Sequence, residues 1–242
     1  MSTLAGNPKS VTMGFDEKLC WLRADVTTDQ QGRQTSFQYD DMGRLVTTSY
    51  PDATVETSTY DAEGRRLTST GRAGRTTLFD YDELGRLTKT TYVDGAFTTT
   101  AYDSIGRVVS STDARGKSTS FAYDSANRRS KITDALNNIT LFSYDANGNQ
   151  LTMIDANNHT TANQYDALNR RTRMIYADGT IDQTSYDGLG RVASKTDQAG
   201  KTTQYGYDAL GRLTGVTDAL NQVTQYGYDE LGNQTSQTDA LG

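Results

Sequence analysis

A tyrosine, an aspartate and an arginine recur close together along this chain of 242 residues, as in the segment Tyr-Asp-Glu-Leu-Gly-Arg-Leu at residues 81–87. A phenol, a carboxylate and a guanidinium held together could bind a polar ligand or transfer protons. The same residues could instead flank a tight turn, in which an aspartate side chain accepts backbone N–H groups. The function of the chain depends on which of these interpretations holds.

Other candidates for chemistry are few, since His159 is the only histidine and Cys20 the only cysteine. A Ser-His-Asp or Cys-His catalytic group would have to use His159, which we interpret as a solvated turn residue. Zinc needs three or four Cys or His ligands, and one cysteine excludes an internal disulfide framework. We interpret Cys20 as a small buried hydrophobe. No nucleotide-binding loop is present, so we predict no enzyme, no cofactor and no metal.

The Tyr-Asp pairs repeat with a period of 21 residues, which is the mark of a repeat architecture. We number each repeat from its tyrosine as position 1. A catalytic pair of carboxylates would be unique, whereas this aspartate occurs in all ten copies, so repetition favours a structural role. The repeat tyrosines are Tyr39, Tyr60, Tyr81, Tyr102, Tyr123, Tyr144, Tyr165, Tyr186, Tyr207 and Tyr228.

Each repeat carries two turn signals. Asp82 at position 2 suits the start of a type I turn, and Gly85 at position 5 suits a residue with positive φ. Asn127 and Asn169 replace that glycine with a residue that tolerates the left-handed region. The second signal ends at position 15, which is Gly or Asn in every copy except that of Ala53, and it includes the hairpin pairs 94–95 and 178–179, both Asp-Gly.

Short Thr-rich segments with β-branched and aromatic residues separate the turns, and none has helical spacing. We therefore predict an all-β repeat protein of about ten 21-residue repeats, built from stacked antiparallel β-hairpins. A parallel β-helix could have the same period and stays open as an alternative. One repeat alone cannot fold, because burying an aromatic side chain contributes about 1.5–3 kcal/mol whereas ordering costs roughly 1.5 kcal/mol per residue.

Residues two apart on a strand share a face, so positions 20 and 1 predict an aromatic row on one side of the sheet. We expect the leucines at position 4 to extend this row. Three copies lack the aromatic at position 20 and carry Tyr50, Tyr92 or Tyr176 at position 12, with Val55, Phe97 or Ile181 predicted directly across the hairpin. Only the copy of Asn163 has neither, and we predict that it packs most weakly. The position 4 leucines are Leu84, Leu168, Leu189, Leu210 and Leu231.

The repeats divide the chain into residues 1–36, a divergent first repeat or a cap built around Phe15 and Trp21, and residues 37–242, an array that stops midway through a repeat. Exposed terminal strands predict self-association by strand pairing. The net charge of −6, with both signs mixed, gives no basic stripe for nucleic acid. No signal peptide or membrane-spanning apolar run is evident, so we predict no membrane insertion.

The period, the pattern Tyr-Asp-x-x-Gly-Arg-Leu-Thr and the Gly or Asn turns resemble the rearrangement-hotspot (Rhs) or YD-repeat family, over about residues 29–242. That family includes bacterial Rhs polymorphic toxins, insecticidal Tc toxins and animal teneurins. The resemblance implies hairpins wound into a curved or spiralling sheet, here an open arc of an Rhs-type β-shell. It also implies a bacterial protein that is secreted or displayed as part of a larger exported toxin.

The implied function is that of a non-enzymatic segment of a shell that encapsulates a toxin or effector domain, with the rest of the shell and its cargo as partners. In the bacterial members a conserved core closes the shell and cuts itself near Asp-Pro motifs. Neither Pro8 nor Pro51 follows an aspartate, so we expect no such autoproteolytic centre in this chain. The alternative function is a glycan-binding or adhesive surface module. Tyrosine with nearby Asp, Asn and Arg can stack on sugar rings, and Tyr50, Tyr92 and Tyr176 beside a turn are the candidate stacking residues.

Overall fold

A computed structural model describes residues 10–16 and 21–241, and all regular structure in this part of the chain is β-strand. The described residues form 22 strands. The chain divides into two compact units, Met1–Ser120 and Phe121–Gly242. We describe each unit by itself. The predicted all-β class is confirmed.

The first unit is a run of hairpins in chain order, each strand pairing antiparallel with the next. Its strands are β1 (Ser10–Asp16), β2 (Trp21–Thr28), β3 (Gln34–Tyr39), β4 (Leu45–Ser49), β5 (Val55–Tyr60), β6 (Arg66–Thr70), β7 (Thr76–Tyr81), β8 (Leu87–Thr91), β9 (Phe97–Tyr102) and β10 (Val108–Thr112). Strand β11 (Ser118–Tyr123) pairs with β10 through residues 118–120.

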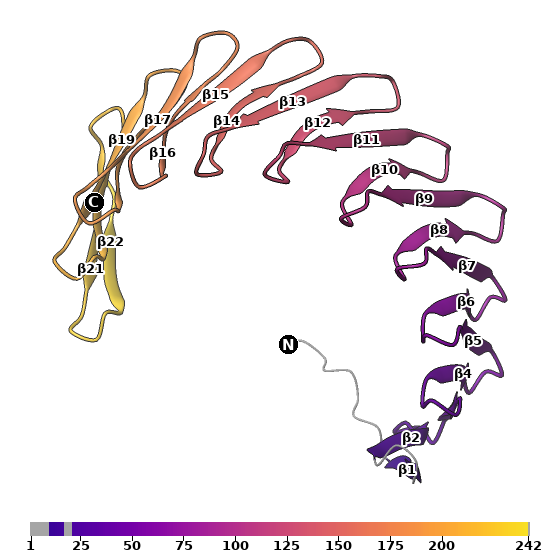
Figure 1. The fold of residues 1–242 in the computed structure, drawn as a ribbon. Helices are drawn as coiled ribbons and strands as arrows, with labels where there is room; N and C mark the ends of the chain where they lie inside the picture. The colour runs from indigo at the N-terminus through magenta and orange to yellow at the C-terminus, as the bar shows by residue number, and fades with distance from the viewer. Residues whose placement is uncertain (1–9, 17–20, 242) are drawn as a thin grey trace. The chain divides into compact units, whose positions relative to one another are not determined.

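The second unit repeats the same plan, again with antiparallel pairing between successive strands. Its strands are β12 (Arg129–Thr133), β13 (Ile139–Tyr144), β14 (Gln150–Ile154), β15 (Thr160–Tyr165), β16 (Arg171–Ile175), β17 (Ile181–Tyr186), β18 (Val192–Thr196), β19 (Thr202–Tyr207), β20 (Leu213–Thr217), β21 (Val223–Tyr228) and β22 (Gln234–Thr238). Figure 1 shows successive hairpins of each unit side by side. The antiparallel pairing rules out the parallel β-helix.

Both turns of the repeat close in the same way. In the first, Gly85 donates its N–H to the carbonyl of Asp82 at 2.9 Å, and Asp82 donates to the carbonyl of Arg86 at 3.0 Å. In the second, Gly95 and Tyr92 play the same parts, with bonds of 2.9 and 2.8 Å. The residue whose N–H bonds the first residue of the turn has positive φ, as predicted at Gly85 (77°), Asn127 (64°) and Asn169 (60°). Ala53, for which no positive φ was predicted, has φ of 63°.

The two faces of the sheet differ in character. Aromatic residues at positions 20 and 1, such as Phe79 and Tyr81, are half-buried on one side, which we call the tyrosine face. The opposite side carries hydroxyl pairs between neighbouring strands, such as Thr70 with Thr76 at 2.9 Å. Among the described residues no hydrophobic side chain is fully buried, and Thr48 and Asn163 are the only buried polar residues. The fold is therefore stabilised through the backbone ladder and contacts between repeats.

Two details of the predicted faces are wrong. The position 4 leucines do not extend the aromatic row, because they lie at the tips of the first turns. Their side chains are 70–89% exposed, from Leu168 with the lowest value to Leu231 with the highest. Position 17 lies opposite position 11, so that Val55 pairs with Ser49 and Ile181 with Ile175. The N–H of position 12 bonds the carbonyl of position 16 and so belongs to the turn, as in Tyr50 and Thr54. Position 17 is therefore paired one residue earlier than predicted, which places Val55 and Tyr50 on opposite faces.

The N-terminal segment follows the repeat pattern where it is described. Between β2 and β3, Gly32 donates to the carbonyl of Asp29 at 3.0 Å and Asp29 donates to that of Arg33, as in the later turns. Cys20 and the side chains of Phe15 and Trp21 lie outside the described residues. The cap and the boundary at residue 36 therefore stay predictions.

Candidate functional site

The aspartate at position 2 makes its side-chain hydrogen bonds within its own turn. In the Asp82 copy, one carboxylate oxygen, Oδ1, accepts the N–H groups of Leu84 at 3.0 Å and of Arg86 at 2.9 Å. The other oxygen, Oδ2, accepts Nε of Arg86 at 2.6 Å. Three donors therefore occupy this carboxylate, which makes it a turn clamp and leaves it poorly suited to act as a general base.

These bonds stabilise the charged form of the carboxyl. The N–H of Arg86 and then its guanidinium hold the pKa of Asp82 below its ordinary value, against partial desolvation. The pKa of Asp208 is lowered in the same way, first by the Arg212 side chain and then by its N–H. Both aspartates are therefore ionised at neutral pH.

The arginine at position 6 does more than pair with this aspartate. The Nη1 group of Arg86 donates to the backbone carbonyl of Asp103 in the next repeat at 3.1 Å, and its guanidinium carbon lies 4.6 Å from the ring centre of Tyr102. The same carbonyl bond is made by Arg44, Arg65, Arg128, Arg191 and Arg212. The same ring contact is made by these five and by Arg170.

The tyrosine at position 1 completes the contact in the opposite direction. Tyr102 donates its hydroxyl proton to the carbonyl of Leu87 in the preceding repeat at 3.0 Å. Equivalent bonds of 2.8–3.1 Å are made by Tyr60, Tyr81, Tyr144, Tyr165, Tyr186, Tyr207 and Tyr228. Neighbouring repeats are thus bound to each other by the arginine of one repeat and the tyrosine of the next, and we call this arrangement the repeat joint.

One joint lacks the arginine and is built differently. Asn149 donates Nδ2 to Oδ2 of Asp145 at 2.8 Å, as the arginine would. The same amide also contacts Oδ1 of Asn169 in the next repeat at 2.7 Å, and Asn147 reaches that oxygen at 3.0 Å. Asparagine at position 5 of the following copy therefore supplies the bond that a glycine could not.

The same neighbourhood contains the copy that we expected to pack weakly. Asn163 stands in place of the aromatic at position 20 and is only 8% exposed. Its Nδ2 donates to the carbonyl of Gln150 at 3.1 Å, which also accepts the Tyr165 hydroxyl, and its Oδ1 has no partner. A buried amide with one unpaired atom costs stability. Weak packing of this copy stays a prediction.

The candidate stacking tyrosines offer only part of their hydroxyl groups and rings to a ligand. Tyr50 donates its hydroxyl to Glu56 at 2.8 Å, and Tyr176 donates to Asp182 at 2.6 Å. These bonds to the neighbouring carboxylates raise the pKa of both tyrosines. The guanidinium of Arg72 covers one face of the Tyr50 ring at 4.2 Å and pairs with Asp52. Tyr92 is 41% exposed.

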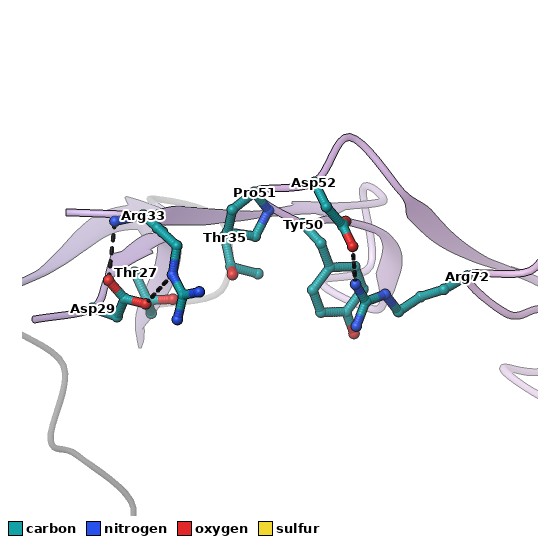
Figure 2. Close-up of a pocket in the computed structure, with 8 residues that line it drawn as sticks. All are labelled: Thr27, Asp29, Arg33, Thr35, Tyr50, Pro51, Asp52 and Arg72. Atoms are coloured by element: carbon teal, nitrogen blue, oxygen red, sulfur yellow. Dashed lines mark hydrogen bonds and ion pairs between the residues drawn. The ribbon is translucent and has the colours of Figure 1, made fainter. Parts of the chain in front are cut away.

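A shallow hollow adjoins Tyr50 in the first unit, with a volume of about 460 Å³. Figure 2 shows Tyr50 and Arg72 on one side of it and the Asp29–Arg33 ion pair on the other, with Thr35 and Pro51 between them. The hollow is lined by hydroxyl, carboxylate and guanidinium groups and one aromatic ring. Such a lining suits a ligand that is rich in hydroxyl groups.

The remaining candidates behave as simple turn residues. The His159 ring is 64% exposed and lies 3.2 Å from its own turn aspartate, Asp155. Among residues 10–16 and 21–241 there is no cluster of His, Cys, Asp and Glu that could hold a metal ion. The same ranges contain no helix long and apolar enough to cross a bilayer.

From the sequence, the arginine was expected only to flank a tight turn, and the contact of the Arg86 side chain with the next repeat was missed. A signal was present in the sequence. Arginine at position 6 and tyrosine at position 1 of the next copy always lie 16 residues apart, as in Arg86 and Tyr102. Neighbouring repeats contact each other in a stacked array, so this fixed spacing across the repeat boundary permits a contact between the two side chains.

Comparison with known proteins identifies the repeat. The family model described as RHS Repeat matches residues 24–55, 60–96, 102–139, 140–181, 186–220 and 207–242, which is most of the chain. This chain belongs to the RHS repeat family. Among curated proteins, none matches the sequence of this RHS repeat array.

Solved structures share the fold of this RHS repeat array. The crystal structure of TcdB2-TccC3 has a TM-score of 0.59 and 17% identity over 88% of this chain and 15% of that chain. The TcdB2-TccC3-TEV crystal structure has a TM-score of 0.55 and 15% identity over 90% of this chain and 16% of that chain. A Photorhabdus luminescens Tc holotoxin pore with mutated TccC3 has a TM-score of 0.54 and 16% identity over 90% of this chain and 15% of that chain. The RHS repeat array thus spans less than a fifth of the chains it resembles.

Proposed function

We propose that this RHS repeat array is a non-enzymatic wall segment of a shell that encloses a toxin or effector domain within a larger exported bacterial protein. The repeat joint is the main support for the proposal, because its recurring polar groups make hydrogen bonds within and between repeats. Asp82 clamps its turn, Arg86 binds the next repeat and Tyr102 binds back. Such a device suits a structural wall, since repetition adds a joint with every copy.

Enclosure supplies a direct test in the full parent protein. Protease should cut an enclosed domain slowly while the wall is intact, because the domain is kept from the solvent. Replacing Arg86, Arg191 and Arg212 by alanine should open the wall and speed that cleavage. The matched control is Arg115→Ala, which removes an exposed arginine at a turn tip. A domain cut equally fast in wild type and triple variant would contradict the proposal.

The hollow beside Tyr50 favours a second function, the binding of a glycan by the array. Its lining combines one aromatic ring with Asp, Arg and Thr side chains, which can stack on a sugar and bond its hydroxyl groups. A glycan array followed by calorimetric titration tests this function. Binding should be saturable and lost in Tyr50→Ala, with Tyr92→Ala and Tyr176→Ala testing the other two candidate residues. The absence of saturable binding would exclude the glycan function and leave the wall proposal unaffected.

A further inference from the structure

A row of exposed leucines runs along one margin of the second unit. Position 4 is leucine in four successive repeats, and each side chain lies at the tip of the first turn of its repeat. The exposed fractions are 70% for Leu168, 75% for Leu189, 78% for Leu210 and 89% for Leu231. We call these four residues the leucine row. Single exposed leucines need no explanation, whereas a regular row of them makes this margin a candidate contact surface.

The turn itself does not require leucine. Position 4 contributes only its backbone N–H, which Leu189 donates to Oδ1 of Asp187 at 2.9 Å. Ala126 and Asn147 make the same bond at the same distance in their own turns. A turn tip in water favours a polar side chain, so four leucines in succession at this position have a role other than building the turn.

The spacing of the row restricts what can cover it. Successive repeats are two strands apart, and strands lie about 4.8 Å apart, so the leucines follow one another at roughly 10 Å. A partner with the same spacing stays in register with all four side chains. A second copy of this chain has that spacing, and a row of equal steps matches itself when turned about a two-fold axis.

The charges beside the row also permit contact between two copies. The arginines that follow each turn are paired with the aspartates that open it, at 2.6 Å for Arg170–Asp166, 2.7 Å for Arg191–Asp187 and 2.6 Å for Arg212–Asp208. The margin is therefore locally neutral around Leu168, Leu189 and Leu210, whereas the turn of Leu231 carries Asp229 and Glu230 with Asn233 in place of the arginine. A two-fold axis sets this acidic turn against the neutral turn of Leu168, so the two acidic turns do not face each other.

We propose that the leucine row is a self-association surface, which packs against the leucine row of a second copy of this chain. Four side chains bury less than the roughly 800 Å² per partner of a stable interface, so the dimer is weak and forms at high protein concentration. The contact becomes strong where two rows are held near each other in one assembly, because the effective concentration is then high. This surface differs from the terminal strand edges.

Sedimentation velocity of the purified chain, from low micromolar to near-millimolar concentration, tests the proposal. The wild type should show a sedimentation coefficient that rises with concentration. The variant with Leu168, Leu189, Leu210 and Leu231 replaced by serine should stay monomeric over the same range. These side chains are exposed, so the circular dichroism spectrum should be unchanged.

Two control variants separate the leucine row from other surfaces. Leu136→Ser with Leu220→Ser removes two exposed leucines, 73% and 76% exposed, from the second-turn margin and should leave self-association intact. Thr235→Lys with Gln237→Lys adds charge to strand β22 and should also leave it intact. A wild type that stays monomeric, or an association weakened by the β22 variant and not by the leucine variant, would overturn the proposal.

Discussion

The guanidinium of Arg86 lies 4.6 Å from the ring centre of Tyr102, so the arginine of one repeat covers the tyrosine of the next. The same arginine bonds Asp82 in its own turn and the carbonyl of Asp103 in the following repeat. A single side chain therefore connects a turn, a backbone and an aromatic ring. This geometry gives a structural reason for Tyr, Asp and Arg to recur together.

Removing one joint should destabilise the array. We expect Arg86→Ala to lower the melting temperature by about 2–4 °C, on the scale of the loss of a cation–π contact and its hydrogen bonds in a chain of this size. Arg86→Lys should not restore stability, since one ammonium cannot bond Asp82 and Asp103 and cover Tyr102 together. Arg115→Ala, which alters an exposed turn tip, is the control and should leave the melting temperature unchanged.

Acid should destabilise the array through the turn aspartates. Hydrogen bonds from the partner residues lower the folded-state pKa of Asp82, Asp187 and Asp208. A lowered folded pKa stabilises the fold above the unfolded pKa, and this stabilisation is lost as the pH falls through the folded value. The melting temperature should therefore be level near neutral pH and fall between about pH 5 and pH 2. Equal melting at both ends of that range would refute the role of the carboxylates.

Ala53 offers a stabilising substitution. It has φ of 63° at the position that is Gly or Asn in every other copy, and its N–H closes the turn to the carbonyl of Tyr50 at 3.0 Å. Because the left-handed region is strained for alanine, Ala53→Gly should stabilise the fold by about 1 kcal/mol in denaturant unfolding. Ala126→Gly, at a turn position without positive φ, should give no gain. Equal effects of both substitutions would contradict this explanation.

The joint that lacks arginine can be rebuilt. The glycine at position 5 lies beneath the arginine of the preceding repeat, and a Cβ placed on Gly190 would come within 3.3 Å of Nη1 of Arg170. Asn149→Arg together with Asn169→Gly should therefore raise the melting temperature above that of the wild type. Asn169→Gly alone should lower it, because Asn149 loses its partner at 2.7 Å. A double variant less stable than Asn169→Gly would show that the arginine joint is not transferable.

The sequence predicted what is local to one repeat. Gly85 and Asn127 marked positive φ because few residues tolerate it, and Asp82 marked a turn because its carboxylate bonds the N–H two residues on. The contact between Arg86 and Asp103 was missed because it joins residues 17 apart in different repeats. The position of Leu84 was wrong because a residue of the turn was assigned to the face of the strand before it, whereas in the turn the side chain is exposed.

A double-mutant cycle between Arg86 and Tyr102 tests the central claim, that these residues form a joint between repeats. The unfolding free energies of Arg86→Ala, Tyr102→Leu and the double variant should give a coupling energy of about 0.5–1 kcal/mol. The control cycle pairs Arg44, which covers Tyr60 instead, with Tyr102 and should give no coupling. Coupling in the Arg86–Tyr102 cycle above that control is the predicted result, and equal, near-zero coupling in both cycles would contradict the repeat joint.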